Sequence, residues 1–205
     1  MAAVPGDASD ETLMVRYQRG DRDAFTLLVR RHHRPIYNFV LRQLRHPTLA
    51  EEVTQDVFLR VVQNASEYKH EARFCTWTYA IARNLCVDQL RKAQHRRHPS
   101  LDQPLGPADD ARALGELVSD AKPQGNTEQS AASSQMRVML IQAVETLPDD
   151  QREVYLLREL ANLSFKEIAE VTGVAENTAK SRMRYALERL RTRLADYEEY
   201  ARALR

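Results

Sequence analysis

The chain has few of the residues that punctuate or cross-link a fold. Its 205 residues include only six Gly, eight Pro, two Cys and one Trp. Two cysteines cannot build a disulfide framework, and the scarcity of Gly and Pro leaves room for long helices. Val, Ile and Thr form no alternating runs bounded by turns, so strands have little support. The sequence therefore predicts an all-α fold.

Long apolar runs are also missing. No stretch approaches the roughly 18–20 apolar residues that a membrane-spanning helix needs. Residues 1–10 contain neither the basic nor the apolar segment of a secretory signal. We therefore expect a soluble, cytoplasmic protein. Its hydrophobic content of 43% is ordinary for a globular chain, and its length allows one domain or two small ones.

The formal net charge of +1 conceals an asymmetry along the chain. Residues 11–97 carry 16 basic and 9 acidic side chains, whereas residues 98–135 carry 2 and 6. Residues 136–205 carry 12 of each sign. Such asymmetry points to polyanionic partners. Of the 30 basic residues 25 are Arg, which suits bidentate phosphate contacts, although genome composition is the simpler explanation.

Apolar residues spaced by three and four predict helices through the first basic block. We expect them over residues 10–19, from residue 21 or 23 to a break at His46-Pro47, from Thr48 onward, and over residues 74–92. Pro35 falls inside the second helix, where it would have to kink the helix or lie near a break.

Periodicity stops in residues 98–135, where Pro, Gly, Ser and Asp accumulate and the charge turns acidic. A structureless stretch of this length is uncommon inside one compact domain. We therefore predict two helical domains, residues 10–97 and 136–196, joined by a flexible acidic linker over residues 98–135.

The sharpest pattern lies in residues 164–195. Ser164 and Glu167 match a capping box, Gly173 ends a short helix, and a long helix begins near Glu176. This order is typical of a helix-turn-helix, whose second helix enters the major groove with its N-terminal part. The candidate DNA-binding residues are Asn177, Thr178, Lys180, Ser181, Arg182, Arg184 and Tyr185. The alternative is an amphipathic helix with a solvated charged face; the capped first helix and the Gly-containing turn favour DNA binding.

A second pattern sets aromatic side chains beside basic ones between Arg73 and Lys92. Aromatic rings can stack on unpaired bases while cations hold phosphate. Spacing alone favours the simpler interpretation, in which Trp77 and Tyr79 are core aromatics.

Four motifs in order resemble the extracytoplasmic-function (ECF, group IV) sigma factors of bacterial RNA polymerase, in the sigma-70 superfamily. They are Ala50–Val61, Phe74–Arg91, Leu147–Val154, and the pair Ser164–Ala169 with Asn177–Arg182. The resemblance covers roughly residues 10–97 and 136–195. It implies an alternative sigma factor that binds core RNA polymerase and directs promoter-specific transcription initiation.

By this resemblance, the first block is a sigma-2 domain that binds core polymerase, recognises the minus-ten element and melts it. Residues 68–76 would capture an everted base, and the helix from Trp77 to Arg91 would face the nontemplate strand. The residues implied in minus-ten binding are Tyr68, His70, Phe74, Trp77, Arg83, Asn84, Asp88 and Arg91. Those implied in binding the β′ clamp helices are Glu52, Asp56, Arg60 and Gln63.

The last block would be a sigma-4 domain that binds the β flap and reads duplex minus-thirty-five DNA with the seven residues of the long helix. The family also implies an anti-sigma factor as partner, which can hold the chain at the inner membrane if it is itself membrane-bound. The chain departs from the usual family pattern at His70, Thr78, Ala175 and Ala179, which bears on promoter preference rather than on class.

An enzymatic function has no support in the sequence. We find no Gly-rich phosphate loop, nucleophile–base arrangement or metal-ligand set. We therefore expect no catalytic residue, metal, cofactor or small-molecule substrate. Cys75 and Cys86 lie 11 residues apart, or ~16 Å along a helix, which is too far for a disulfide. The remaining alternative is a stand-alone helix-turn-helix regulator that acts without the polymerase, but it leaves the first block unexplained.

Overall fold

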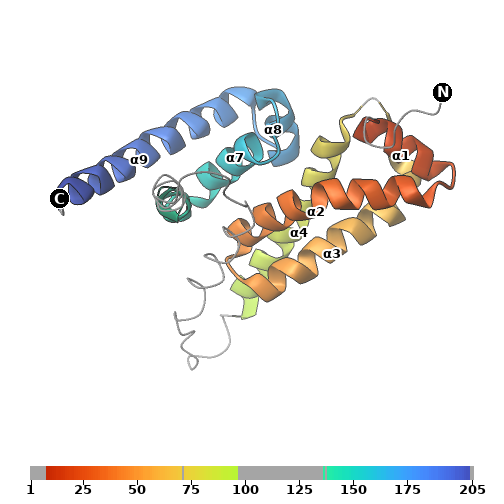
Figure 1. Ribbon diagram of the computed structural model, residues 1–205, viewed down its shortest axis with the longest axis horizontal. Coiled ribbons are helices and arrows are strands. Elements are labelled where there is room, and N and C mark those ends of the chain that lie inside the picture. The colour runs from red at the N-terminus through yellow and green to blue at the C-terminus, as the bar shows by residue number, and fades with distance from the viewer. Residues whose placement is uncertain (1–7, 71, 97–135, 137, 204–205) are drawn as a thin grey trace, which may run out of the picture. The chain divides into compact units, whose positions relative to one another are not determined.

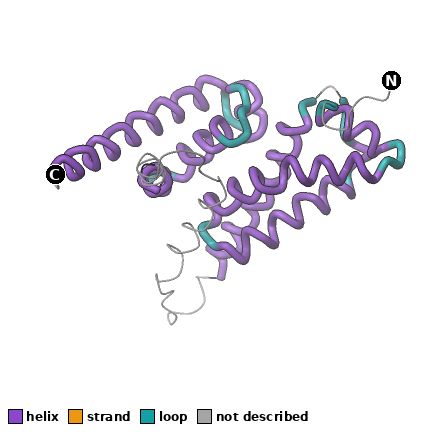
Figure 2. The backbone as a smooth tube through the Cα atoms, in the orientation of Figure 1, coloured by secondary structure: helices purple, strands orange, loops and turns teal. Residues whose placement is uncertain are grey.

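The computed structural model describes residues 8–70, 72–96, 136 and 138–203. Every regular element in these ranges is a helix (Figure 2), which confirms the predicted all-α fold. The chain divides into two compact units, Met1–Leu101 with Leu156–Ala179, and Asp102–Tyr155 with Lys180–Arg205. The predicted linker, residues 98–135, lies outside the described residues. Within those residues, no helix combines the length and apolar character needed to cross a bilayer.

The N-terminal part of the first unit is a bundle of helices. In chain order these are α1 (Asp10–Gln18), α2 (Arg22–Leu44), α3 (Pro47–Gln63), the 3-10 helix η1 (Ala65–Glu67) and α4 (Phe74–Arg96). Helices α2 and α3 pack side by side, and α4 packs against both (Figure 1). Helix α1 packs on α2 and also contacts α4 and η1.

Side-chain caps explain where three of these helices begin. Ser9 accepts a hydrogen bond from the Thr12 N–H at the start of α1, and Asp21 does the same for the first turn of α2. His46 caps α3, whose first residue is Pro47. These side chains satisfy backbone N–H groups that have no partner within the helix.

Helix α2 runs past Pro35, so of the two expectations for this residue, a kink or a nearby break, the break does not occur. Leu28, Ile36 and Phe39 on either side of the proline are fully buried. Packing along the whole helix therefore offsets the backbone hydrogen bond that proline removes. The helix ends instead at Arg45, whose left-handed φ of 56° takes the chain out of the helical path.

The packing of α2 against α4 is led by two aromatic rings. Phe39 and Tyr79 meet edge to face with ring centroids 5.2 Å apart. Both side chains are at most 1% exposed, and burial raises the pKa of Tyr79. The interpretation of Tyr79 as a core aromatic is therefore confirmed.

After the linker, residues 138–145 are helical, followed by α7 (Asp149–Glu159), α8 (Phe165–Thr172) and α9 (Glu176–Ala203). Arg152 in α7 is only 2% exposed. Its guanidinium donates to the Leu147 carbonyl at 3.1 Å and to the Asp149 carboxylate at 2.7 Å. These hydrogen bonds fix the turn that precedes α7.

The predicted capping box opens α8. Ser164 Oγ accepts from the Glu167 N–H, and the Glu167 carboxylate accepts from the Ser164 N–H at 2.8 Å. The helix ends at Gly173, whose φ of 72° lies in the left-handed region that favours glycine. The order of elements predicted for the helix-turn-helix segment is therefore confirmed.

Leu28 provides a test of the bundle core. Leu28→Ala removes a fully buried side chain and should lower the free energy of unfolding by about 2–5 kcal/mol, measured by urea denaturation. Leu59 is 56% exposed, so Leu59→Ala serves as the matched control and should change stability by about 0.5 kcal/mol or less. Equal effects of the two substitutions would contradict the described packing.

Candidate nucleic-acid interface

Helix α3 presents a polar face beside a buried one. Glu52, Asp56, Arg60 and Gln63 are all exposed. Their spacing of four, four and three residues places them along one side of the helix. The predicted polymerase-binding residues therefore form a single exposed surface, which we call the α3 face.

Two apolar residues on this helix escaped the sequence-based prediction. Leu59 is 56% exposed and Val62 is 39% exposed. Leu59 lies three residues after Asp56 and therefore within the α3 face. The available signal was that Leu59 falls outside the stripe of Val53, Val57 and Val61, which are buried.

Helix α4 presents a second exposed stripe. Asn84, Asp88 and Arg91 are exposed and spaced by four and three residues, so they share one face. Arg83 is half-buried beside them, and His70 is exposed in the segment before the helix. The structure therefore groups three of the predicted minus-ten residues along α4, and their contact with DNA stays a prediction.

Tyr68 and Phe74 occupy a different environment from the predicted one. Their side chains are 5% and 0% exposed and lie in a cluster with Leu13, Met14 and Leu28. Neither ring has a free face on which an unpaired base could stack, so the structure favours a role inside the core. Aromatic character identified these residues, but it cannot distinguish a stacking platform from a core residue.

The Tyr68 hydroxyl is also committed within the protein. It donates to the Ala72 carbonyl at 2.6 Å. Burial, with the carboxylates of Glu11 and Asp10 nearby, raises the pKa of Tyr68 to about 12. Trp77, whose ring centroid lies 5.1 Å from that of Tyr68, is half-buried and keeps part of its surface accessible.

Helix α1 is tied to α2 beside Phe74. The Asp10 carboxylate bonds His32 Nε2 at 2.6 Å and Arg31 Nη1 at 2.7 Å. The His32 ring lies 5.2 Å from the Phe74 ring, measured between centroids. The hydrogen bond to His32 lowers the pKa of Asp10, burial partly opposes this, and Arg31 adds to the lowering.

The first part of α9 exposes most of the predicted duplex-binding residues. These exposed residues are Asn177, Thr178, Lys180, Ser181, Arg184 and Tyr185. Ala179, Met183 and Ala186 are buried on the other side of the helix. Arg182 is half-buried, and its Nε lies 3.1 Å from the Asp150 carboxylate. Asp150, which precedes the helix-turn-helix, therefore pairs with one of its candidate DNA-binding arginines.

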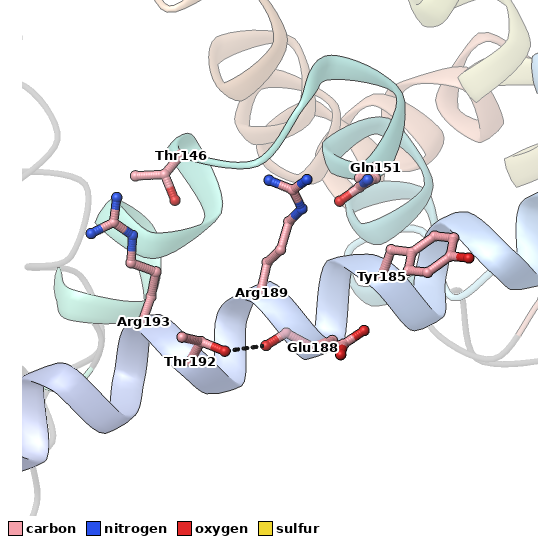
Figure 3. A pocket seen from close by; sticks show the side chains of 7 residues that line it. All are labelled: Thr146, Gln151, Tyr185, Glu188, Arg189, Thr192 and Arg193. Atoms are coloured by element: carbon pink, nitrogen blue, oxygen red, sulfur yellow. Dashed lines mark hydrogen bonds between the residues drawn. The ribbon is translucent and has the colours of Figure 1, made fainter.

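Further along α9 lies a groove within the second unit (Figure 3). It is lined by Thr146, Gln151, Tyr185, Glu188, Arg189, Thr192 and Arg193. Arg189 and Arg193 continue the basic character of the helix beyond the seven predicted residues. They were not predicted because only the N-terminal part of a recognition helix is expected to reach base edges.

Comparison with known proteins supports the predicted order of the two domains. Residues 28–96 match Sigma-70 region 2, and residues 137–190 match Sigma-70, region 4. The region 4 match is continuous in sequence, although it includes segments of both compact units. The ECF RNA polymerase sigma-E factor of Escherichia coli is 33% identical over 88% of this chain and 91% of its own length. The chain belongs to the ECF sigma factors.

A second relative matches this sigma factor over a similar share of both chains. The ECF RNA polymerase sigma factor SigW of Bacillus subtilis is 30% identical over 87% of the present chain and 93% of its own.

Two solved structures share the fold. CnrH in complex with the cytosolic domain of CnrY matches with a TM-score of 0.64 and 21% identity, covering 92% of this chain and 99% of that one. The sigma factor RpoE in complex with the anti-sigma factor NepR from Bartonella quintana matches with a TM-score of 0.61 and 20% identity, over 83% and 96%.

The two cysteines of this sigma factor are free thiols, as their spacing predicts. Cys86 is buried and Cys75 is half-buried. Burial raises the pKa of Cys75 to about 11, against the lowering effect of the nearby Arg73. Because the thiolate is the reactive form, the Cys75 thiol is poorly suited to redox chemistry at neutral pH.

Asp10→Asn tests the tie between α1 and α2. A carboxyl whose pKa is lowered by folding contributes stability above its unfolded pKa, and this contribution is lost as pH falls through the folded value. The difference in unfolding free energy between wild type and Asp10→Asn should therefore be constant at neutral pH and shrink below about pH 3.8. Urea denaturation across this range measures it. A difference that stays constant into the acid range would contradict the proposed tie between Asp10 and α2. Asp88→Asn, at an exposed carboxylate, is the control and should show no such change with pH.

Proposed function

We propose that this sigma factor binds core RNA polymerase and directs promoter-specific initiation through three surfaces. The observation that carries the proposal is that one chain has both surfaces. The α3 face lies within the region 2 match, and the exposed basic start of α9 lies within the region 4 match. A stand-alone helix-turn-helix regulator would need only the second of these surfaces, so this alternative is not favoured.

The α3 face is the proposed contact with the β′ clamp helices. It offers both signs of charge through Asp56 and Arg60, together with the exposed apolar Leu59. Charges of both signs orient a partner, while an apolar side chain contributes affinity when it is covered. The region 4 domain would contact the β flap in addition.

Minus-ten recognition is proposed for residues 68–76 and α4. Opening a duplex unstacks bases at a cost of a few kcal/mol each, which a pocket and a stacking surface can offset. His70 and Trp77 have accessible surface at the segment, and Arg91 is exposed to hold phosphate along the helix. Tyr68 and Phe74 would act from the core by shaping the segment.

Minus-thirty-five recognition is proposed for the start of α9. A duplex displays its full hydrogen-bonding code in the major groove, where a helix fits. Asn177, Lys180 and Arg184 are exposed donors on this helix. Arg182 would leave or share its ion pair with Asp150 when it contacts DNA.

An anti-sigma factor is the proposed regulator. RpoE of Bartonella quintana, which shares the fold, is in complex with the anti-sigma factor NepR. If the regulator of the present chain is membrane-bound, it would hold the sigma factor at the inner membrane. The sigma factor itself would supply promoter recognition, and the phosphoryl transfer of RNA synthesis would belong to the polymerase.

The α3 face can be tested by removing its charges. Asp56→Ala combined with Arg60→Ala should weaken binding to core polymerase by about tenfold or more, because both side chains would be covered in the complex. The equilibrium dissociation constant, measured with fluorescently labelled chain, gives the effect. Glu51→Ala changes another exposed carboxylate of α3 and serves as control. Unchanged affinity of the double variant would contradict the assignment.

Arg182→Ala tests the minus-thirty-five surface. If Arg182 contacts a guanine edge, the substitution should cost about 1–3 kcal/mol of binding and relax the preference at one base pair. Binding of the assembled holoenzyme to wild-type and changed minus-thirty-five sequences measures both effects. Equal losses on all sequences would indicate a phosphate contact only, and no loss would exclude the arginine from the interface. Arg191→Ala, an exposed arginine later in α9, is the control.

A further inference from the structure

The segment between α3 and α4 is held at both ends by helix α1. We call residues 68–70 and 72–76 the capture segment; the inference drawn from it rests on the proposed minus-ten function. Two polar side chains of α1, Gln18 and Glu11, reach backbone groups at η1 and at the start of α4. Neither residue belongs to the surfaces proposed above.

Gln18 holds the beginning of the segment. Its Nε2 donates to the Ala65 carbonyl at 2.7 Å and to the Tyr68 carbonyl at 2.9 Å. Both N–H groups of one side-chain amide thereby donate to carbonyls, one at each end of η1. These hydrogen bonds set the direction in which the chain leaves η1 and enters the capture segment.

Glu11 holds the start of the helix that follows. Its Oε1 accepts from the Phe74 N–H at 3.1 Å. Phe74 is the first residue of α4, and the first turn of this helix contains no acidic residue of its own. A first-turn N–H has no partner within its helix, and a carboxylate is favoured there by the helix dipole. Glu11 therefore acts as a cap supplied by another helix.

The two side chains act as a pair because of their spacing. Gln18 follows Glu11 by seven residues, which is two helical turns, so both point from one side of α1. Met14 lies between them, is fully buried, and belongs to the same cluster as Tyr68 and Phe74. Asp10 in turn bonds Arg31 and thus anchors α1 on α2. Helix α1 therefore fixes the position of the capture segment relative to α2.

We propose that Glu11 and Gln18 are positioning residues for minus-ten recognition: they set the backbone of the capture segment and thereby its ability to discriminate the everted base. They do so without touching DNA. Backbone geometry matters because a small displacement of a site lowers its complementarity to the bound group. Loss of either tie leaves the core cluster in place but removes a hydrogen bond that fixes one end of the segment, while the Tyr68 hydroxyl still donates to the Ala72 carbonyl.

The experiment uses the full chain assembled with core polymerase. The probes are single-stranded DNA oligonucleotides carrying the nontemplate minus-ten sequence of the promoter most active with the wild-type chain, intact or with one abasic site at each position in turn. The ratio of dissociation constants, abasic over intact, measures base capture. This ratio is insensitive to a variant that merely reduces the fraction of folded protein.

Gln18→Leu and Glu11→Ala should lower this ratio by about two- to tenfold at the captured position, the range expected for a lost hydrogen bond. Glu11→Gln keeps an acceptor oxygen and should restore most of the wild-type ratio. Arg19→Ala, at the exposed C-cap residue that follows α1, is the control and should leave the ratio unchanged. Affinity for core polymerase should be the same for every variant.

Two results would overturn the inference. Gln18→Leu and Glu11→Ala could both keep the wild-type ratio, with any loss of affinity equal on intact and abasic DNA, or Glu11→Gln could lose as much as Glu11→Ala. Failure of the proposed function has a separate signature. In that case the wild-type holoenzyme itself would bind intact and abasic oligonucleotides equally at every position.

Discussion

Burial of Phe74 is the interaction on which the N-terminal bundle depends. Its ring is fully buried among Leu13 of α1, Leu28 of α2 and Val61 of α3. An aromatic side chain buries roughly 150–250 Å² and dominates the energetics of a small core. Phe74 is also the first residue of α4, so the residue that fills the core also begins this helix.

The proposed functional surfaces are the faces that this core leaves exposed. Packing of Val53, Val57 and Val61 turns the charged side of α3 outward. Packing of Tyr79, Ala82 and Cys86 does the same for the stripe of α4 that carries Asn84 and Asp88. The apolar spacings of the two helices therefore leave exposed the proposed polymerase-binding surface on α3 and the proposed DNA-binding surface on α4. The capture segment lies between the two helices, so the positions of both helices constrain its backbone.

Local signals in the sequence were sufficient for the elements and for many exposed site residues. Ser164 with Glu167 and the glycine at 173 marked the ends of α8, because capping and left-handed turns depend on adjacent residues. The polar spacing along α3 and α9 likewise marked their exposed faces. For Pro35 the sequence left a kink and a nearby break open, and the helix continues past it because the local cost of proline is offset by packing from other helices.

Contacts between distant residues could not be predicted in this way. Gln18 lies 47 and 50 residues from the carbonyls that it holds, and Glu11 lies 63 residues from Phe74. Nothing near Gln18 or Glu11 in sequence distinguishes them from other polar residues of an amphipathic helix. The burial of Tyr68 and Phe74 was missed for a related reason, since an aromatic residue beside basic ones suits both a core and a base-stacking surface.

Run-off transcription with core polymerase, this chain and a genomic promoter pool tests the central claim most directly. The claim predicts transcripts from a limited set of promoters that share two sequence elements, at the minus-ten and minus-thirty-five positions. It also predicts that the chain without polymerase does not select those promoters. Selective binding of the same duplexes by the free chain, with no promoter-specific transcripts in the presence of polymerase, would contradict it and favour a stand-alone regulator.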